Sequence, residues 1–584
     1  MTAPGRKPVL RTLGLSLILV ANVFVFTPFT LYVGNLDEFS MPVWPMLALF
    51  GIPALALIGS LMIIGIVLGE ASYRRYTVLV ATVGLLLWLQ GNALVWEYGL
   101  LDGQNIDWTQ GAWRGWVDLG IWIVAILAAM VFYRAAERPI VHAAVAVFGL
   151  QLLVLAYSGF QNADGLLAKS QVTHSADALQ EIQRFSSTQN VLHIILDGFQ
   201  ADVFNEIISN DVIGPHYRSA LQGFTFFKDN LGAFPTTYMA VPAFMSGEIY
   251  RNHIPKKAFL QSVLGGKSII NTAFEAGYEL DLVSEEYWIG KYIAAKHTNS
   301  YLIPTTQRAT AQARVLDEAA KLLDLTLFRL GPHFLKKYIH NDQVWIVQPA
   351  IFGSNNLPFW YFEHTAFLNG LTENMSADRA APVYKLIHIM NTHSPMVVDG
   401  NCEYVGGSLP RNRMTVTTQS RCSLDVIIRL LDKMKQLGIY ENSLIVLMAD
   451  HGAGLAPYEL KARPAENGED AVLINPKVVS MATPLMAVKP PGASGPLQVS
   501  SAPSSYTDIP ITIASILGLK SEFGGRPVFD LRPGEQRERR HYLHGWRRGD
   551  WETEYFGPIQ EFIVNGNVYD SAAWQPGEKF LPPD

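Results

Sequence analysis

Five long apolar segments occupy the first quarter of this 584-residue chain. They cover residues 12–33, 41–68, 77–96, 116–133 and 139–159. Because a helix needs about 20 apolar residues to cross a bilayer, this pattern predicts a bundle of five transmembrane helices within residues 1–159. The first segment is longer than the usual apolar core of a cleavable signal peptide, and four more segments follow it. We therefore expect it to stay in the mature protein.

Basic residues are distributed unevenly around these segments. Seven of them lie on one side, and these are Arg6, Lys7, Arg11, Arg74, Arg75, Arg134 and Arg138. The loops on the other side are acidic, and Arg114 is their single basic residue. Because loops rich in Lys and Arg stay in the cytoplasm, we expect a cytoplasmic N-terminus in a multi-pass protein of the cell membrane. The chain after about residue 160 is then extracytoplasmic.

The pattern changes after the apolar segments. Residues 160–188 are mostly polar, and we interpret them as a linker. Residues 191–196 and 444–448 are short apolar runs of the kind that form buried parallel strands, and a helical periodicity lies between them. This alternation predicts an α/β domain with a mostly parallel central sheet, which we place at residues 189–584.

The composition agrees with a membrane protein and excludes some other classes. The chain is 49% hydrophobic and 16% charged, whereas soluble domains carry about 25% charged residues. A net charge of −6 argues against a nucleic-acid-binding protein, which needs a basic surface to displace counterions. Cys402 and Cys422 are too few for a zinc ribbon. Outside the cytoplasm they can form one disulfide bridge, and two unpaired buried thiols are the alternative.

Polar residues directly follow the two expected strands. Asp197 follows the first strand, and Asp450 and His451 follow the second. Because ligands bind beyond the carboxyl ends of parallel strands, these three side chains are candidate ligands of a divalent metal ion. The segment Pro235-Thr-Thr-Tyr-Met-Ala-Val-Pro242 offers a hydroxyl that a metal would activate as a nucleophile. Each motif alone also occurs as an ordinary turn or loop.

Taken together, these motifs resemble the alkaline phosphatase and sulfatase superfamily. The resemblance covers about residues 190–530 and includes His388-Ile-Met-Asn-Thr-His393-Ser-Pro395, which is similar to a His-x-x-x-x-His-x-Pro segment of that family. It implies an alkaline-phosphatase-like fold for the outer domain. It also implies that His388 and His393 bind the phosphate ester or protonate a leaving group, and buried structural histidines are the alternative.

Five membrane helices before such a domain resemble the phosphoethanolamine transferases and the lipoteichoic-acid-type phosphoglycerol transferases of the inner (cell) membrane. The resemblance implies one divalent ion, Zn²⁺ or Mn²⁺, held by four side chains. These are Asp197, Thr237, Asp450 and His451. Asp197 stands where those transferases have Glu, as it does in sulfatases and phosphodiesterases. Their nucleophile lies five residues before a proline, which favours Thr237 over Thr236 because Thr237 is five residues before Pro242.

The resemblance thus implies a phosphotransferase. It would move a phosphoethanolamine- or phosphoglycerol-type group from a membrane phospholipid to an envelope glycan or lipid, through phosphothreonine. A sulfatase-like hydrolase of phosphate or sulfate esters is an alternative. True sulfatases, however, make formylglycine from Cys or Ser in Cys/Ser-x-Pro-x-Arg, and residues 237–241 lack these residues. A non-catalytic lipid-binding or regulatory relative is the other alternative.

Overall fold

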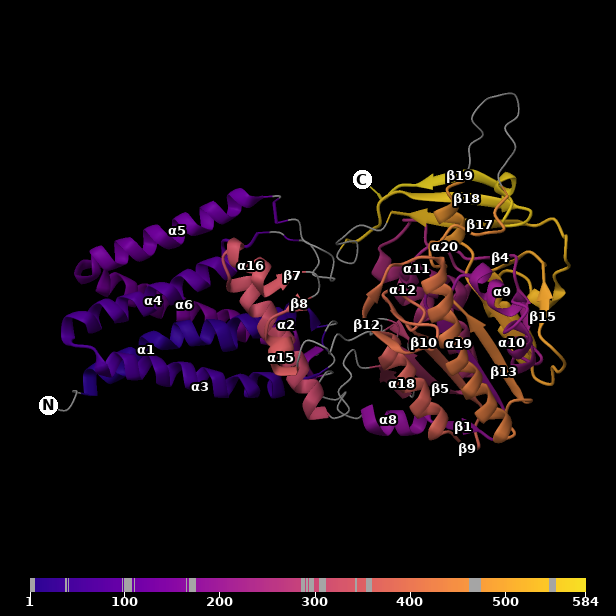
Figure 1. The fold of residues 1–584 in the computed structure, drawn as a ribbon, viewed down its shortest axis with the longest axis horizontal. Coiled ribbons are helices and arrows are strands. Elements are labelled where there is room, and N and C mark those ends of the chain that lie inside the picture. Colours follow the sequence, from indigo (N-terminus) through magenta and orange to yellow (C-terminus); the bar gives the residue numbers. More distant parts are fainter. Residues whose placement is uncertain are drawn as a thin grey trace, which may run out of the picture. The chain divides into compact units, whose positions relative to one another are not determined.

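The computed structural model divides the chain into two compact units (Figure 1). The described residues are 6–36, 39, 41–96, 98, 108–109, 111–163, 165–167, 175–284, 289, 292–293, 299–303, 311–341, 344–352, 360–461, 474–545 and 553–583. The helical unit comprises Met1–Thr173 and Thr306–Leu357, and the sheet unit comprises His174–Thr305 and Pro358–Asp584. Thr306–Leu357 therefore groups with the N-terminal helices, whereas the sequence analysis placed it in the outer domain.

Long helices form the N-terminal part of the helical unit. They are α1 (Arg6–Ala21), continued by η1 (Asn22–Phe26) and α2 (Thr27–Gly34), then α3 (Val43–Val67), α4 (Glu70–Asn92), α5 (Ala112–Val131) and α6 (Tyr133–Gln161). Among the described residues, four spans are long and apolar enough to cross a membrane: Thr12–Gly34, Val43–Val67, Ala112–Val131 and Tyr133–Gln161.

The predicted third crossing lies in α4, which is not one of these four spans. Its N-terminal turns carry Glu70, Arg74 and Arg75, and its C-terminal turn carries Gln90 and Asn92. These polar ends lower the mean hydropathy of the helix. The structure therefore supports four apolar helices, and the fifth crossing stays a prediction.

A second set of elements completes the helical unit. It consists of α15 (Ala311–Leu330), α16 (His333–Ile339), β7 (His340–Asn341), β8 (Val344–Trp345) and α17 (Val347–Phe352). Figure 1 shows α15 and α16 lying across one end of the N-terminal helices.

An eight-stranded sheet forms the centre of the sheet unit. Its order is β15 (Gln498–Ser500), β3 (Thr225–Phe227), β14 (Met486–Lys489), β13 (Ser443–Met448), β2 (Asn190–Leu196), β10 (Val383–Ile389), β5 (Glu279–Ser284) and β6 (Asn299–Leu302). β14 is antiparallel to both of its neighbours, and the other neighbouring pairs are parallel. The mostly parallel sheet predicted from the sequence is confirmed.

Helices cover both faces of this sheet. Leu192 and Ile194 of β2 point into one apolar core, which packs against α9 (Ala201–Ser209), α18 (Trp360–Glu373) and α19 (Arg413–Gln436). Val191 and Ile195 point into the other core, which packs against α11 (Thr237–Ser246), α12 (Lys256–Leu264), α13 (Ile269–Glu275) and α21 (Ile509–Leu517). The central strands are buried on both faces, and this explains why they are almost continuously apolar in sequence.

Smaller elements surround the main sheet. A C-terminal antiparallel sheet is formed by β17 (Glu538–His544), β18 (Ile559–Asn565) and β19 (Trp574–Phe580). A hairpin is formed by β11 (Met396–Val398) and β12 (Tyr404–Leu409). The remaining elements are α8 (Ser175–Ile182), β1 (Arg184–Ser186), α10 (Gly214–Ala220), β4 (Asn230–Leu231), β9 (Ser376–Arg379), α20 (Pro476–Met481), β16 (Ser504–Ser505), η4 (Tyr506–Asp508), η5 (Val528–Asp530) and η6 (Ser571–Ala573).

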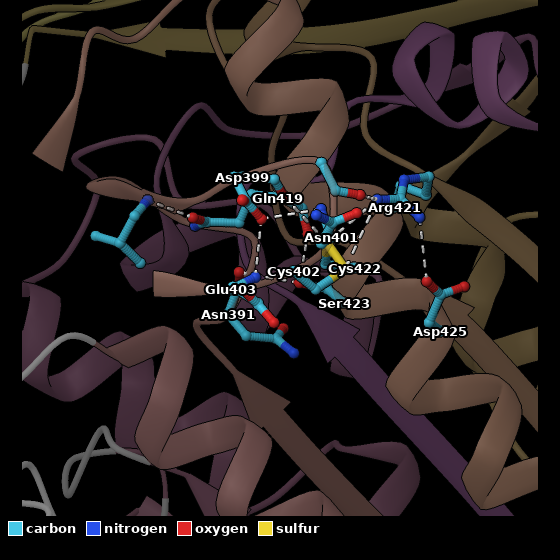
Figure 2. Close-up of a disulfide and its surroundings, with 12 residues drawn as sticks. Asn391, Asp399, Asn401, Cys402, Glu403, Gln419, Arg421, Cys422, Ser423 and Asp425 are labelled. Carbon is cyan, nitrogen blue, oxygen red and sulfur yellow. Dashed lines mark hydrogen bonds and ion pairs between the residues drawn. A yellow bond between two sulfur atoms is a disulfide. The ribbon is translucent and has the colours of Figure 1, made fainter. Parts of the chain in front are cut away.

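A disulfide bridge joins the β11–β12 hairpin to helix α19. Cys402 lies in the turn of the hairpin and is bonded to Cys422 in the helix (Figure 2). Asp399 accepts hydrogen bonds from the backbone N–H groups of Asn401 and Glu403 at 2.9 and 3.0 Å, and these bonds shape the same turn. The bridge between the two cysteines, which the sequence left open, is confirmed.

Candidate active site

Three neighbouring strands end at the same level of the sheet. Ile195 of β2 pairs with His388 of β10 on one side and with Met448 of β13 on the other. The residues that follow these strands therefore emerge together at one edge. Parallel strands place their carboxyl ends side by side in this way, and this edge is where open α/β sheets bind ligands.

Asp450 is held by the loops that follow β2 and β13. Its Oδ1 accepts backbone hydrogen bonds from Gly198 at 3.1 Å and from His451 at 2.9 Å. Gly198 has a φ of +70°, which glycine adopts without steric cost. Gly452 also has to be glycine, because a Cβ there would lie 1.8 Å from the carbonyl oxygen of Ser480. These contacts fix the carboxylate of Asp450 before any ligand binds.

Thr237 is the first residue of α11, and its hydroxyl lies between two carboxylates. The hydroxyl donates to Asp450 Oδ2 at 2.6 Å and lies 3.3 Å from Asp197 Oδ2. Thr236 is the N-cap residue and has an extended backbone. The N-terminus of α11, with its partial positive charge, therefore adjoins the hydroxyl, which is a suitable arrangement for binding an anionic ester.

Three histidines surround the buried carboxylate of Asp197. His388 Nε2 lies 3.3 Å from Asp197 Oδ2, and His451 Nε2 lies 3.7 Å from Oδ1. Burial alone would raise the pKa of Asp197, but His393, His388 and His451 together hold this pKa well below its ordinary value. Burial lowers the pKa of His451, and the carboxylates of Asp450 and Asp197 outweigh burial and raise it. The charged forms of the Asp197 carboxylate and the His451 imidazole therefore stabilise each other.

The donor set fits a divalent metal ion. One ligand atom from each of Asp197, His388 and Asp450 lies within 4.8 Å of the other two. Asp197 Oδ1 is buried and accepts no hydrogen bond from the described residues. His451 donates from Nδ1 to the carbonyl oxygen of Gly452 at 3.0 Å, which directs its Nε2 lone pair toward the carboxylates. Carboxylate oxygens and imidazole nitrogens are ordinary ligands of zinc and similar cations.

His393 borders the centre on the side of Gly198. Its Nδ1 donates to the carbonyl oxygen of Ser394 at 2.8 Å, and its ring packs edge-on against Trp360 with a centroid distance of 5.2 Å. Thr392 donates a hydrogen bond of 2.6 Å to the carbonyl oxygen of Asp197 and fixes this loop against β2. The hydrogen bond to Ser394 uses Nδ1, and Nε2 is the other polar atom of the ring.

The structure brings together all six residues singled out in the sequence. They are Asp197, Thr237, His388, His393, Asp450 and His451. Their individual roles stay predictions. The geometry adds one point for His388, because the sequence analysis expected it to contact substrate and the structure groups it with the two carboxylates as a possible metal ligand.

Sequence reasoning missed His544, which reaches the first turn of α11 from the C-terminal sheet. Its Nε2 lies 3.0 Å from the Thr236 hydroxyl, and its ring stacks on Phe556 with a centroid distance of 4.3 Å. No short-range pattern links His544 to Thr236, since the two residues are 308 positions apart. Only the pairing of β17 with the segment before α11 brings them together.

The model of the sulfatase family matches residues 189–519, which is more than half of the chain. This chain belongs to the sulfatase family. It is therefore an enzyme of the alkaline phosphatase superfamily. The match begins one residue before β2 and includes Asp197, Thr237, Asp450 and His451. His544 and the C-terminal sheet lie beyond it.

Several solved structures are similar to this sulfatase-family chain. The phosphonate monoester hydrolase SpPMH from Silicibacter pomeroyi is 15% identical, with a TM-score of 0.39 and coverage of 66% of this chain and 88% of its own. The lipoteichoic acid synthase LtaP from Listeria monocytogenes is 11% identical, with a TM-score of 0.36 and coverage of 69% of this chain and 92% of its own. The C-terminal periplasmic domain of EcEptC from Escherichia coli, in complex with Zn, is 13% identical. Its TM-score is 0.35, and the match covers 67% of this chain and 92% of its own. No curated protein sequence matches the chain.

Proposed function

We propose that this enzyme transfers a phosphoethanolamine- or phosphoglycerol-type group from a membrane phospholipid to an envelope glycan or lipid. The observation that carries the proposal is the Thr237 hydroxyl, which lies at a helix N-terminus within hydrogen-bond distance of two buried carboxylates. Four apolar helices in the same chain give a reason for a lipid donor. The active-site residue is a threonine, whereas formylglycine forms from Cys or Ser.

A divalent ion, Zn²⁺ or Mn²⁺, would be held by Asp197, Thr237, Asp450 and His451, with His388 as a further candidate ligand. Such an ion lowers the pKa of a coordinated hydroxyl and stabilises negative charge on the oxygens of the ester. The protein itself supplies the alignment. Asp450 Oδ2 accepts the hydrogen bond of Thr237 at 2.6 Å, and this bond holds the hydroxyl oxygen in place.

The proposed first step forms a bond between Thr237 Oγ1 and phosphorus. The hydroxyl proton leaves along the hydrogen bond toward Asp450. The bond from phosphorus to the diacylglycerol oxygen breaks, and the imidazolium of His393 protonates that oxygen. The partial positive charge at the start of α11 favours the ester oxygens throughout the step.

The proposed second step reverses the roles. A hydroxyl of the acceptor attacks phosphothreonine, and neutral His393 takes its proton. The bond from phosphorus to Thr237 Oγ1 breaks, and Oγ1 recovers its proton from Asp450. If water replaces the acceptor, the same residues hydrolyse the ester. The match to the sulfatase model favours this hydrolase of phosphate or sulfate esters as the second candidate.

Trapping of the intermediate tests the proposal. After incubation with a phospholipid labelled in its headgroup, the peptide that contains Thr237 should carry the phosphoryl group in the mass spectrum. Thr237→Ala should lose the adduct and reduce turnover by roughly 10³-fold or more, since it removes the nucleophile. It should still bind a divalent ion, because Asp197, Asp450 and His451 remain. Asp450→Ala should lose both ion and activity.

The controls separate the candidate functions. Thr236→Ala should retain the adduct on Thr237. If the Thr237→Ala variant and the Thr236→Ala variant each keep full activity, the nucleophile is an activated water molecule and the enzyme is a hydrolase. A full-length protein that binds no stoichiometric divalent ion and forms no adduct would instead be a non-catalytic relative.

A further inference from the structure

A segment within the sulfatase match folds with the membrane helices. Thr306–Leu357 belongs to the helical unit, although the family match runs through it. We refer to residues 311–352, which contain α15, α16 and α17, as the cap. Figure 1 shows α15 of the cap crossing one end of the N-terminal helices.

Hydrogen bonds identify the end of the helices that the cap covers. Glu318 of α15 accepts a bond from the backbone N–H of Met41, just before α3, at 3.0 Å. Arg329 donates from Nε to the carbonyl oxygen of Gly91, at the end of α4, at 2.9 Å. Leu322 of α15 belongs to the same apolar core as Phe29 of α2. The cap therefore packs on the end where α2 and α4 finish and α3 begins.

A buried carboxylate anchors the cap to α5 at the same end. Asp118 is completely buried and accepts hydrogen bonds from Gln90 Nε2, Trp96 Nε1 and the backbone N–H of His333, at 3.1, 2.9 and 2.9 Å. Phe334 of α16 packs where a Cβ on residue 115 would stand, since that Cβ would lie 2.7 Å from its ring. The cap is thus seated by specific contacts.

The covered end is the one that the charge asymmetry places outside the cytoplasm. It joins the loop between α2 and α3 to the loop between α4 and α5, and these loops are the acidic ones. A helix that crosses the ends of membrane-spanning helices lies along the membrane surface. In a membrane, α15 and α16 are therefore expected at the level at which lipid headgroups meet the hydrocarbon.

Large apolar side chains remain exposed beside the contacts between the cap and α5. We refer to Trp113, Trp116, Leu335 and Tyr338 as the rim, and they are 58%, 68%, 53% and 68% exposed. Trp116 packs edge-on against Phe334 with a centroid distance of 5.5 Å, which joins the α5 and α16 parts of the rim. Trp and Tyr are enriched at membrane interfaces, where each ring has an apolar and a hydrated side.

The rim continues into a surface that is already expected to face lipid. Val124 and Leu127, further along α5, are 66% and 59% exposed in a span apolar enough to cross a membrane. Next to Tyr338, Lys337 places its Nζ 4.9 Å from the centre of the Tyr338 ring. Apolar, aromatic and cationic side chains thus occur together here, as they do at the boundary between hydrocarbon and headgroups.

We propose that the cap is an interfacial membrane-binding element whose rim inserts into the headgroup region of a phospholipid bilayer. The bilayer is the partner because the rim is continuous with the apolar surface of α5. The cap also has a place in the enzyme. The chain leaves the sheet unit to form it and returns at Pro358, two residues before Trp360, which contacts His393. A short stretch of the chain therefore joins the cap to Trp360.

Spin labels on the full-length protein in vesicles of phosphatidylethanolamine and phosphatidylglycerol test the proposal. Nitroxides are attached to Leu335→Cys and Tyr338→Cys, and collision rates are measured with oxygen and with a water-soluble nickel chelate. Val124→Cys is the lipid control, and Asp211→Cys, in an exposed turn of the sheet unit, is the water control. We expect both rim labels to be several-fold less accessible to the chelate than the label at 211, and shallower than the label at 124.

Rim labels that are as accessible to the chelate as the label at 211 would overturn the proposal. Protection by a second copy of the chain is the other possibility, so the measurement is repeated in nanodiscs holding one chain each. Protection that disappears there would assign the rim to a protein interface. No readout depends on turnover, so the result is independent of the proposed transferase activity.

Discussion

Two adjacent threonines at the start of α11 have different partners. Thr237 faces Asp197 and Asp450, whereas Thr236 faces His544 of the C-terminal sheet. Neighbouring residues in an extended segment point to opposite sides, and Thr236 has the extended backbone of an N-cap. Thr236 can therefore orient the first turn of the helix, while Thr237 is the proposed nucleophile.

His544 is expected to act as a positioning residue through this contact. Thr236→Val keeps the shape of the side chain and removes the hydroxyl, so we expect kcat to fall by about 10- to 100-fold, since small misplacements of a nucleophile have large effects. Thr236→Ser keeps the hydroxyl and should stay near the native rate. His544→Gln retains a polar atom near the Nε2 position and should lose less than His544→Leu.

A double-mutant cycle checks the coupling between these two residues. If the contact is the cause, Thr236→Val combined with His544→Leu should be little worse than either change alone. Fully additive losses would show that the two side chains act separately. Metal content should stay unchanged in all of these variants, since neither side chain is one of the proposed ligands.

His541, a second histidine of the C-terminal sheet, leads us to expect that the folded protein becomes less stable in acid. Burial lowers the pKa of His541 to about 4, although its hydrogen bond to the carbonyl oxygen of Gly232 opposes this shift. Between about pH 6.5 and 4 the unfolded chain then binds more protons at this site than the folded chain. Stability should fall as the pH drops through that range, by up to about 1.4 kcal/mol per pH unit.

His541→Asn isolates this effect, because the asparagine amide can still donate to Gly232 without titrating. Its unfolding temperature should decline less between pH 6.5 and 4 than that of the native protein, as followed by thermal unfolding at several pH values. Equal declines in the two proteins would assign the acid sensitivity to other groups.

The sequence predicted the site better than its surroundings. Asp197, Asp450 and His451 could be found because a short apolar run ends just before each motif, and strands in a parallel sheet end together. Thr237 needed a family resemblance, since two threonines in a loop carry no signal of their own. His544 could not be found, because its position depends on the pairing of segments that are far apart in sequence.

At the scale of elements, the disulfide bridge holds a hairpin that follows the active-site loop. Cys402 and Cys422 are 20 residues apart, and closure of such a loop contributes about 3 kcal/mol in the chain-entropy model. We expect the double change Cys402→Ser and Cys422→Ser to lower the unfolding temperature of the sheet unit, as measured by calorimetry. A reductant should destabilise the native protein to the same extent.

The reductant should have no effect on the double variant, which serves as its control. Alkylation of the denatured, unreduced native protein should label neither cysteine. Labelling of both would show that the bridge does not form in the protein as it is made.

The apolar pattern of the sequence predicted elements with continuous apolar runs, but it did not predict elements in which charged residues interrupt the pattern. It predicted the central strands and the positions of the N-terminal helices. It did not detect the cap, because three acidic residues break the apolar pattern of α15. In the structure these residues, Asp317, Glu318 and Asp324, are buried and accept hydrogen bonds from neighbouring elements. Local pattern cannot distinguish such buried acids from surface ones.

At the scale of the whole molecule, the chain passes between the two units three times. It does so after Thr173, before Thr306 and after Leu357. The first passage follows the C-terminal end of α6, and the other two flank the cap. Gly159 near the end of α6 lies beside Phe29 of α2, whose core includes Leu322 of the cap. The end of α6 and the cap therefore lie at the same end of the helical unit.

The seven-to-one asymmetry of basic residues predicts that the chain after about residue 160 is extracytoplasmic. The disulfide bridge agrees with an oxidising compartment. A reporter that is active only outside the cytoplasm should therefore work when it is fused after residue 165 and fail when it is fused after Arg75.

A matched pair of reporter fusions tests whether α4 crosses the membrane, since α4 is not among the four spans that are apolar enough to do so. Fusions after residue 95 and after Arg75 differ only by the presence of most of α4. If α4 crosses the membrane, the first should be active and the second inactive, as measured by reporter activity normalised to protein level. Equal activities would mean that α4 stays on one side. The count of crossings before the sheet unit would then be four, and the unit would face the same compartment as the N-terminus, where lipid donors of the outer leaflet are out of reach.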